Sequence, residues 1–366
     1  MKFLNIVKKI IGFKLIFAKP NKKKVLVYDR DCERIYNKLF PKKYYEILDV
    51  RYESINLYVI LQTLTKYGLK NFKDNYKKCF IDLVSPKIVL TAIDNNPAFY
   101  DLKNINNKPY YVSFQYGMRD NKFYEKCKKF IKKTGRKLKS DYIFLFGKNE
   151  KKRFSKIIDG SIFTYGNVAN NYFHIKKGQL KSKISSMVYI SMYNLSRDTF
   201  SEDKKIFNFL VEFCKRKKIK LSYCAKFGSS KENFIRENLS KGDWTYLPRV
   251  SPVETYNNLN KHQIVVFTYS SLGFEALSKG MRCAAFYKNF PIEGNFVKYS
   301  KSGFFWSEGK NNLEMEKILN RVINTSNKNW KKVVRKYSSE IMEYDPKNTK
   351  IKKILKNILK KRISAN

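Results

Sequence analysis

Histidine is nearly absent from this chain of 366 residues, which contains only His174 and His262. Six cysteines are scattered along it, and no two of them form a C-x-x-C pair. The shortage of histidine and of paired cysteine argues against a zinc site, and the cysteine spacing gives no sign of a disulfide framework. We therefore expect a protein of the reducing cytoplasm that binds no metal.

Acidic residues are also scarce, with 31 Asp and Glu against 76 Lys and Arg, for a net charge of +45. One interpretation is an anionic partner, which would be nucleic acid, an anionic membrane or phosphorylated substrates. The other is composition alone, since Lys, Asn, Ile, Tyr and Phe are all abundant. Specific nucleic-acid binding is disfavoured, because the lysines are spread along the chain and no helix-turn-helix, RNP-like or zinc-finger pattern occurs.

Long apolar runs are missing as well. The N-terminus, "MKFLNIVKKIIGFKLIFAKPNKKK", has no unbroken apolar stretch of membrane-spanning length and no small-residue cleavage site. Its apolar residues recur near helical spacing between lysines, which predicts a helix lying on an anionic lipid surface. The alternative is a helix packed on the folded body. We treat residues 1–23 as a basic amphipathic segment and expect a cytoplasmic protein, peripheral on the inner face of the membrane.

The remaining composition is that of a folded protein, with 43% hydrophobic and 16% aromatic residues. The length suits two domains, and strand patterns alternate with helical patterns in both halves, which is typical of α/β domains with mostly parallel sheets. The segment 147–185 contains Gly147, Gly160 and Gly166 and shows little periodicity, so it is the expected link. The expected units are residues 24–155, 156–310 and a basic helical tail, 311–366.

The stretch "VVFTYSSLGFEALSKGMRCAAF" (265–286) reads as a strand, a turn, a helix and a second strand. Ligands of open parallel sheets bind at the carboxyl ends of strands, and a helix N-terminus favours phosphate. Ser270 and Ser271 add hydroxyl donors, Gly273 permits close approach of a ligand or strand, and Glu275 offers an acceptor for ribose hydroxyls. The alternative is that Ser270 caps the helix and Glu275 completes a capping pair.

Several segments resemble known proteins in the same order along the chain. "LPRVSPVETYNNLNKHQIVVFTYSSLGFEALSKGMRCAAF" (247–286) resembles the C-terminal domain of bacterial surface-polysaccharide enzymes with the two-domain GT-B glycosyltransferase fold. "IVLTAIDNNPAFYDLKN" (88–104) and "YVSFQYGMRD" (111–120) resemble segments of the surface carbohydrate biosynthesis protein family, with further agreement at 144–154, 164–173 and 188–194. The resemblance spans roughly residues 24–310. It implies two Rossmann-like domains facing a cleft, followed by C-terminal helices.

The resemblance implies a glycosyltransferase of surface polysaccharide biosynthesis, such as capsule or lipopolysaccharide. It would move a sugar from a nucleotide-sugar donor to a glycan or lipid-linked glycan acceptor. The donor nucleotide would lie in the C-terminal domain, at Ser270, Ser271 and Glu275. Lys226 and Arg249 are candidates for its phosphates, because both fall near predicted strand ends. No cofactor or metal is implied, since helix dipoles and basic residues can stabilise the leaving phosphates.

The acceptor would lie across the cleft, in the N-terminal domain. Asp94 is the candidate catalytic residue, as a base or as a nucleophile, with Asn95 beside it on the substrate side. Arg119 would hold a carboxylate or phosphate, and Gln115 would orient a hydroxyl. The alternative for Asp94 is a turn aspartate that bonds nearby backbone.

One position departs from the family pattern. Tyr116 stands where the family usually has Asn or His, so a role carried over from that side chain is lost. Asp29 and Glu53, which follow predicted strands, are weaker candidates for the base.

Two other functions remain open. The first is transfer of a polyol phosphate from a cytidine nucleotide of the CDP-glycerol type, on a related fold. Enzymes of that kind generally rely on catalytic histidines, which disfavours this function in a chain with two. The second is a non-catalytic, basic protein that binds nucleic acid through its charge.

Overall fold

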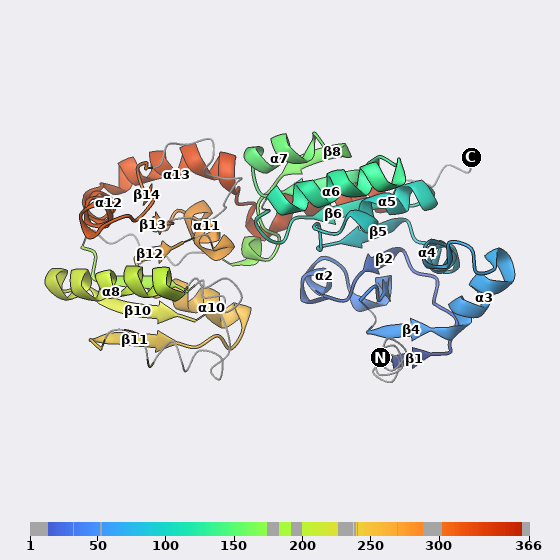
Figure 1. Ribbon diagram of the computed structural model, residues 1–366, viewed down its shortest axis with the longest axis horizontal. Helices are drawn as coiled ribbons and strands as arrows, with labels where there is room; N and C mark the ends of the chain where they lie inside the picture. The colour runs from blue at the N-terminus through green and yellow to red at the C-terminus, as the bar shows by residue number, and fades with distance from the viewer. Residues whose placement is uncertain are drawn as a thin grey trace.

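Two lobes lie side by side in the computed structural model, and each is built on a parallel sheet (Figure 1). The structure describes residues 14–31, 33–51, 53–119, 121–173, 183–191, 200–225, 237, 239, 241–268, 270–287 and 302–360. The N-terminal lobe contains the sheet between residues 25 and 164, and the C-terminal lobe contains the sheet between residues 186 and 307. The expected α/β fold class is confirmed.

The sheet of the N-terminal lobe has six parallel strands in the order β3-β2-β5-β6-β7-β8. Its inner strands are short apolar runs buried on both faces, as parallel sheets covered by helices require. The strands are β2 (Val25–Tyr28), β3 (Tyr45–Leu48), β5 (Ile88–Thr91), β6 (Tyr110–Phe114), β7 (Leu138–Leu145) and β8 (Ile158–Thr164).

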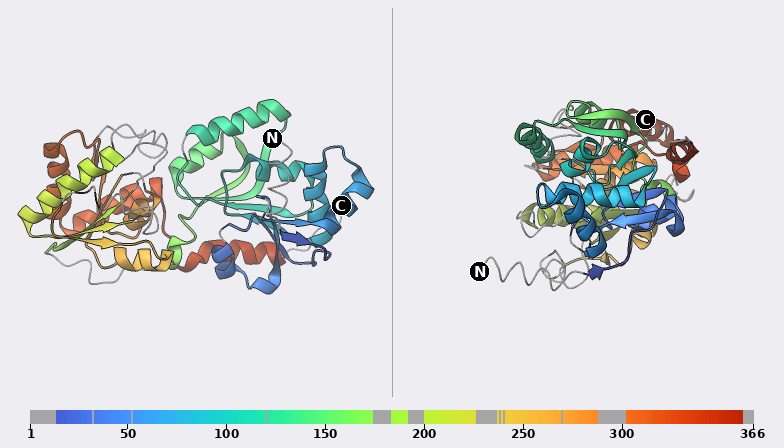
Figure 2. Two further views of the ribbon diagram at one scale, coloured as in Figure 1. Left: turned by 60° about the horizontal axis from the view of Figure 1, so that its bottom comes forward. Right: turned by 90° about the vertical axis from the view of Figure 1, so that its right-hand side faces the viewer.

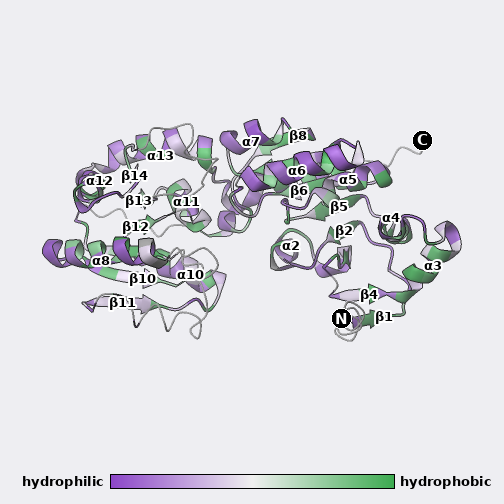
Figure 3. Cartoon of the chain, in the orientation of Figure 1, coloured by the Kyte–Doolittle hydropathy of each residue, from purple (hydrophilic) through white to green (hydrophobic). Residues whose placement is uncertain are grey.

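The sheet of the C-terminal lobe is also parallel and follows the order β11-β10-β9-β12-β13-β14. Figure 3 shows hydrophobic residues along its central strands, as in the first sheet. The strands are β9 (Ser186–Ile190), β10 (Lys220–Cys224), β11 (Trp244–Leu247), β12 (Ile264–Phe267), β13 (Arg282–Phe286) and β14 (Trp306–Ser307).

Helices cover both faces of the first sheet. One face packs on side chains from α2 and from the last helix, and the other packs on α4, α5, α6 and α7. Helix α3 packs against α4 and adds Val59 to the same core; Asn56 caps its start and Gly68 ends it. The helices are α2 (Glu33–Leu39), α3 (Leu57–Tyr67), α4 (Phe72–Val84), α5 (Pro97–Ile105), α6 (Asn121–Thr134) and α7 (Lys148–Phe154).

The remaining helices follow strands of the second sheet or succeed it. The five described cysteines are buried in the cores, and no disulfide joins any two of them. The helices are α8 (Phe200–Lys217), α10 (Pro252–Leu259), α11 (Ser271–Ser278), α12 (Asn312–Asn324), α13 (Asn327–Ile341) and α14 (Thr349–Lys360). Short 3-10 turns lie at Lys42–Tyr44, Asn170–Tyr172 and Pro346–Asn348.

The chain passes between the lobes twice. After α13 it returns to the N-terminal lobe, where Ile351, Leu355 and Ile358 of α14 enter the core beside β2 and β5 (Figure 2). The two passages touch, because Gly166 and Tyr344 form an antiparallel bridge. The Glu343 N–H also donates to the carbonyl of Phe146, which follows β7, at 2.8 Å. At Gly166, φ is +75°, and a Cβ would lie 1.8 Å from the Glu343 carbonyl oxygen, so only glycine fits there.

The link between the lobes is shorter than the sequence indicated. Residues 147–164 form α7 and β8, and β8 is the edge strand of the first sheet. Its sequence, "IDGSIFT", is polar and half-exposed, because only one of its edges is paired, so it lacks the apolar run that marks the inner strands. The division at residue 155 stays a prediction about folding units, whereas the first sheet runs to Thr164.

A small parallel ladder lies beside the first sheet. It pairs β1 (Lys14–Ile16) with β4 (Ser54–Asn56). The basic amphipathic segment expected at residues 1–23 is described only from Lys14 onward, where it begins with strand β1 and not with a helix. Residues 1–13 lie outside the described part of the chain, so the membrane-binding helix stays a prediction. Within the described ranges, no helix combines the length and the apolar character needed to cross a bilayer.

Candidate functional site

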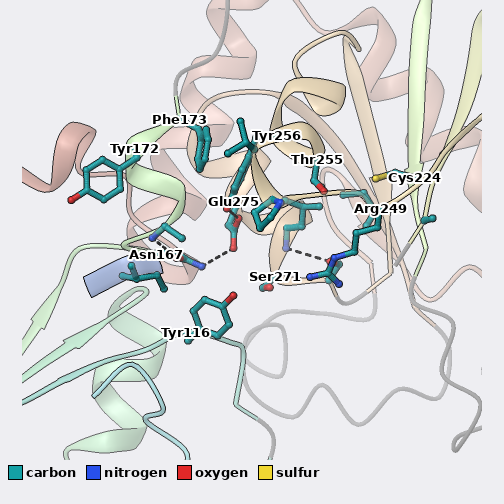
Figure 4. A pocket seen from close by; sticks show the side chains of 18 of the residues that line it. Tyr116, Asn167, Tyr172, Phe173, Cys224, Arg249, Thr255, Tyr256, Ser271 and Glu275 are labelled. Atoms are coloured by element: carbon teal, nitrogen blue, oxygen red, sulfur yellow. Dashed lines mark hydrogen bonds between the residues drawn. The ribbon is translucent and has the colours of Figure 1, made fainter. Parts of the chain in front are cut away.

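A cavity of about 420 Å³ lies between the two lobes (Figure 4). The C-terminal lobe contributes most of its wall, from the carboxyl ends of β9, β10 and β12 and from the starts of α10 and α11. The N-terminal lobe contributes Ile35 and Lys38 of α2 and Tyr116 after β6. The first passage between the lobes contributes Asn167, Ala169, Tyr172 and Phe173.

The start of α11 forms one wall of the cavity. Ser270 caps the helix, since its hydroxyl accepts a hydrogen bond from the Leu272 N–H at 3.3 Å. Ser271 is the first helical residue and lines the cavity with Ser270. The unpaired N–H groups and partial positive charge of a helix N-terminus therefore face this side of the cavity, a suitable environment for an anion.

Glu275 lines the cavity but is held by protein groups. Its carboxylate accepts hydrogen bonds from the Asn167 side chain, at 2.7 Å, and from the Tyr256 hydroxyl. It therefore joins α11 to α10 and to the passage between the lobes, and the capping pair with Ser270 is wrong. Burial raises the pKa of Glu275 to about 7, against the opposing effects of these two hydrogen bonds and of the Lys279 charge.

Aromatic rings continue this contact toward the N-terminal lobe. The rings of Phe173 and Tyr256 stack with their centroids 4.1 Å apart. Two ammonium groups cover the stack: Lys38 lies 4.9 Å from the Phe173 centroid, and Lys279 lies 4.4 Å from that of Tyr256. Burial lowers the pKa of Lys279, while the neighbouring Glu275 carboxylate opposes that shift. Side chains from both lobes and their link thus meet at one edge of the cavity.

The charged groups of the cavity wall are Lys38, Arg249 and Glu275. Figure 4 shows Arg249 extending toward Ser271 from the loop after β11. Because burial favours the neutral form of Glu275, the positive charges of Lys38 and Arg249 dominate. A cavity with this balance attracts an anionic ligand, and the forked guanidinium of Arg249 suits a phosphate.

On the N-terminal lobe, Tyr116 lines the cavity, although the sequence analysis gave it no role in the site. Its hydroxyl points into the cavity, toward the side lined by Ser271 and Glu275 (Figure 4). The neighbouring Gln115 turns inward: its amide accepts from the Phe146 N–H at 2.8 Å and donates to the Gly117 carbonyl at 3.0 Å. Gln115 therefore fixes the loop that presents Tyr116 and does not itself line the cavity.

Asp94 and Arg119 are brought together, but behind the cavity wall. The Asp94 carboxylate is fully buried, and it accepts from the Arg119 guanidinium, with Nε at 2.7 Å, and from the Tyr116 N–H at 3.1 Å. The Asp94 carbonyl also accepts from the Tyr100 hydroxyl at 3.0 Å. Asn95, the next residue, is exposed on the turn. In this arrangement the ion pair holds the loop of Tyr116, and the role of Asp94 in proton transfer stays a prediction.

Two further expected residues have different outcomes. Gly273 is buried, and a Cβ there would lie 2.2 Å from the ring of Phe267, so the glycine lets α11 pack closely on β12. Of the two expected roles of Gly273, close approach of a strand is the one seen in the structure. Gly273 does not line the cavity. Lys226 lies outside the described residues.

Sequence reasoning missed the contribution of the link and of α10. Asn167, Phe173 and Tyr256 were given no role, although all three lie in segments that carried the resemblance. A usable signal was "YGNVANNYF" (165–173), because three asparagines near a glycine in a predicted linker indicate side chains that fix a turn or reach a neighbour.

His262, the one described histidine, lies at the opposite edge of the second sheet. It precedes β12, and its side chain is buried, with Nδ1 2.7 Å from the Asn258 carbonyl oxygen and Nε2 2.8 Å from Ser222 Oγ. Burial lowers its pKa below the ordinary value. His262 is therefore a packing residue, and no imidazole from the described ranges lines the cavity.

Comparisons with solved structures identify the fold. The chain is similar to a "putative UDP-N-acetylglucosamine 2-epimerase" from Listeria monocytogenes, with a TM-score of 0.58, 13% identity, and coverage of 94% of this chain and 99% of that one. The UDP-GlcNAc 2-epimerase from Neisseria meningitidis bound to UDP-GlcNAc gives a TM-score of 0.53 at 11% identity, covering 92% and 98%.

A third similar structure is the wall teichoic acid polymerase TagF soaked with CDPG, with a TM-score of 0.50 and 10% identity. The match covers 94% of this chain and 91% of TagF. At these identities the likeness shows the fold alone, and the GT-B-like arrangement expected from the sequence is confirmed. No curated protein sequence matches the chain.

A family model described as "putative O-antigen biosynthesis protein" matches residues 112–359, which is most of the chain. The matched region contains Tyr116, the link between the lobes, the whole second sheet and α14. The surface-polysaccharide resemblance seen in the sequence is thereby confirmed, and the chain belongs to this family of O-antigen biosynthesis proteins.

Proposed function

We propose that this protein is a glycosyltransferase that moves a sugar from a nucleotide-sugar donor to a glycan acceptor in surface polysaccharide biosynthesis. The observation that carries the proposal is the interlobe cavity, whose C-terminal wall presents the start of α11, Ser271 and Arg249. These are donors for an anion, and they face Tyr116 of the other lobe across a space of about 420 Å³. Membership of the O-antigen biosynthesis family supports the same proposal, as does the similarity to the Neisseria meningitidis epimerase, which was solved with the nucleotide-sugar UDP-GlcNAc bound.

In the proposed reaction, the donor diphosphate lies against the start of α11. Negative charge grows on the diphosphate as the bond to the sugar breaks. The N–H groups at the helix start, the Ser271 hydroxyl and the Arg249 guanidinium are already oriented toward that charge, so they stabilise the transition state without a metal. Glu275 acts indirectly, because its bonds to Asn167 and Tyr256 fix α11 against the link.

The acceptor would enter on the side of the N-terminal lobe, beside Tyr116 and Lys38. Two roles are open to Asp94. As a base or nucleophile it would have to leave its ion pair with Arg119, whereas as a positioning residue it would keep that pair and hold the loop of Tyr116. The geometry favours the positioning role.

A thermal-shift screen of the purified protein with CMP, CDP, UDP and GDP tests the donor site. A nucleotide that binds the native state raises the Tm, by the equivalent of roughly 2.7 kcal/mol at 100 times its Kd. We expect a selective shift that Arg249→Ala and Ser271→Ala both reduce. Arg335→Ala is the matched control, because Arg335 is an exposed arginine on α13 remote from the cavity. If no nucleotide shifts the Tm of well-folded protein, the proposed donor site is wrong.

Polyol-phosphate transfer is the second candidate, favoured by the likeness to TagF. It predicts selectivity for cytidine nucleotides in the same screen. The described histidine gives it no support, since His262 lies away from the cavity.

Product analysis then separates sugar transfer from epimerisation, the reaction named for two of the similar structures. Transfer releases free nucleoside diphosphate and extends a glycan, whereas epimerisation leaves an altered sugar on the nucleotide. Altered nucleotide-sugar without acceptor extension would overturn the transferase proposal while leaving the donor site intact.

A further inference from the structure

Large apolar side chains are exposed at one corner of the N-terminal lobe, formed by β1, α3 and the residues that follow each. Leu61 is 62% exposed, Phe17 72% and Leu69 80%. Leu15 and Leu64 are exposed on the same two elements. The ladder of β1 with β4, which leads directly into α3, places the elements together. We call this set of five residues the β1–α3 patch, because β1 and α3 contact each other.

Helix α3 is apolar on two faces, and only one of them is used by the fold. Val59 and Thr63 point inward and are buried. Leu57, Leu61 and Leu64 recur at spacings of four and three residues, which places them on one stripe of the outer surface. A surface helix normally carries polar residues on its outer face. An exposed apolar stripe of this kind is typical of a surface that binds a partner or a membrane.

Within the two segments that carry the patch the charge has one sign, whereas Glu53, which precedes β4, is an exposed carboxylate beside Lys14. Neither segment that carries the patch, residues 14–24 or 57–73, contains an aspartate or glutamate. Exposed lysines flank the apolar residues along the chain, namely Lys14, Lys19, Lys66 and Lys70. Apolar side chains rimmed by lysines match the two layers of an anionic membrane surface, an apolar interior and a negatively charged headgroup region.

We propose that the β1–α3 patch docks the protein on an anionic lipid bilayer. The patch lies at the end of the N-terminal lobe that faces away from the C-terminal lobe (Figures 1 and 2), so a docked molecule keeps its interlobe cavity off the membrane. The inference does not depend on which reaction the cavity catalyses. A second copy is a poorer occupant, because two chains of charge +45 would bring lysine-rimmed surfaces together. Residues 1–13, which lead into β1, carry the same mixture of apolar and lysine side chains in their sequence.

Vesicle flotation with the full chain tests the proposal. We expect the protein to float with vesicles of phosphatidylglycerol and phosphatidylcholine, to stay behind with pure phosphatidylcholine, and to bind less as salt rises. The double variant Leu61→Gln/Leu64→Gln should weaken partitioning by about tenfold or more, since it removes two apolar anchors. Lys66→Gln/Lys70→Gln should weaken binding to the anionic vesicles by about tenfold.

Leu313→Gln is the matched control, because Leu313 is a leucine of α12 with 64% exposure in the other lobe. Melting curves check that every variant folds. The proposal is overturned if the unchanged protein does not float with anionic vesicles, or if Leu61→Gln/Leu64→Gln floats as well as Leu313→Gln. It is also overturned if the patch variant instead splits a dimer seen in solution. Crosslinking of position 64 to residues 1–13, unaltered by vesicles, would assign the patch to the chain's own N-terminal segment.

Discussion

The two lobes share one sheet topology but differ in the residues that follow the strands at the carboxyl edge of each sheet. Each has six parallel strands and one point where the strand order reverses, between β2 and β5 in the first sheet and between β9 and β12 in the second. Ligands of such sheets bind beside this switch point, at the carboxyl ends of the strands. In the C-terminal lobe the switch point lines the cavity with Ser191, Ser270 and Ser271.

In the N-terminal lobe the equivalent edge is occupied by ion pairs. Asp29, which follows β2, accepts from Arg51 Nε at 2.7 Å, and Asp94, which follows β5, is bonded to Arg119. The carboxylates occupy guanidinium donors at this edge, so fewer donors are left for a phosphate. The same topology therefore supplies a binding edge in one lobe and a rigid support in the other. Serine hydroxyls follow the strands at the binding edge, and ion-paired aspartates follow them at the supporting edge.

The largest effect is expected when a charge is removed from the ion pairs at the edge of the N-terminal sheet. Asp94→Asn leaves the Arg119 guanidinium buried without its carboxylate, which should lower the free energy of unfolding by about 3–5 kcal/mol. Chemical denaturation measures the loss. Glu316→Gln is the control, because its pair with Arg216 is largely exposed and should change stability by less than about 1 kcal/mol. A stable but inactive Asp94→Asn protein would instead favour direct catalysis by Asp94.

A second test compares two buried carboxyls, Glu150 in the N-terminal lobe and Glu275 in the C-terminal lobe. Burial raises the pKa of each from 4.5 to about 7. A raised folded-state pKa means that the native state holds its proton more tightly than the unfolded chain does. The resulting stability is present below about pH 4.5 and is lost as the pH rises through about 7.

Relative to the unchanged protein, Glu150→Gln and Glu275→Gln should therefore each gain roughly 1–3 kcal/mol of unfolding free energy as the pH rises across this window. Urea denaturation at several pH values measures the gain. If the lobes are equivalent in this respect, the two variants give parallel curves. A flat difference for either one would show that its carboxyl titrates over the same pH range in the folded and the unfolded states.

The smallest effect is expected at the edge of the C-terminal sheet, where Ser270 and Ser271 can be tested separately. Ser270→Ala removes the cap of α11 and should cost about 1 kcal/mol of stability. Ser271→Ala removes no cap, so its melting temperature without ligand should stay close to that of the unchanged protein. Thermal melts with and without the selected nucleotide separate the two serines. Equal losses of stability without ligand would contradict the division between a capping Ser270 and a ligand-facing Ser271.

Much of the fold could be predicted because its signals are local. The inner strands are short apolar runs, Gly68 ends α3, and α14 shows its buried stripe at Ile351, Leu355 and Ile358. Strand β8 escaped prediction because an edge strand needs no continuous apolar run.

The site was predictable where residues follow a strand directly, as with Ser270, Ser271 and Arg249. It was not predictable where side chains distant in sequence satisfy one another. Glu275 reads as a ribose acceptor until Asn167, 108 positions away, is found bonded to it. Asp94 was assigned to catalysis and Arg119 to substrate binding, and nothing in their spacing shows that they bond each other.

Helix α14 has a consequence for the biogenesis of the protein. The ribosome produces the strands of the first sheet early, but one face of that sheet is covered only in part, by α2, until Ile351, Leu355 and Ile358 have been made. The first lobe to be synthesised is thus among the last to be completed, and its nascent form presents β2 and β5 to solvent while the second lobe is translated. Such an intermediate is a natural client for chaperones that recognise apolar strands, and a chain cut before α14 would keep that exposed face permanently.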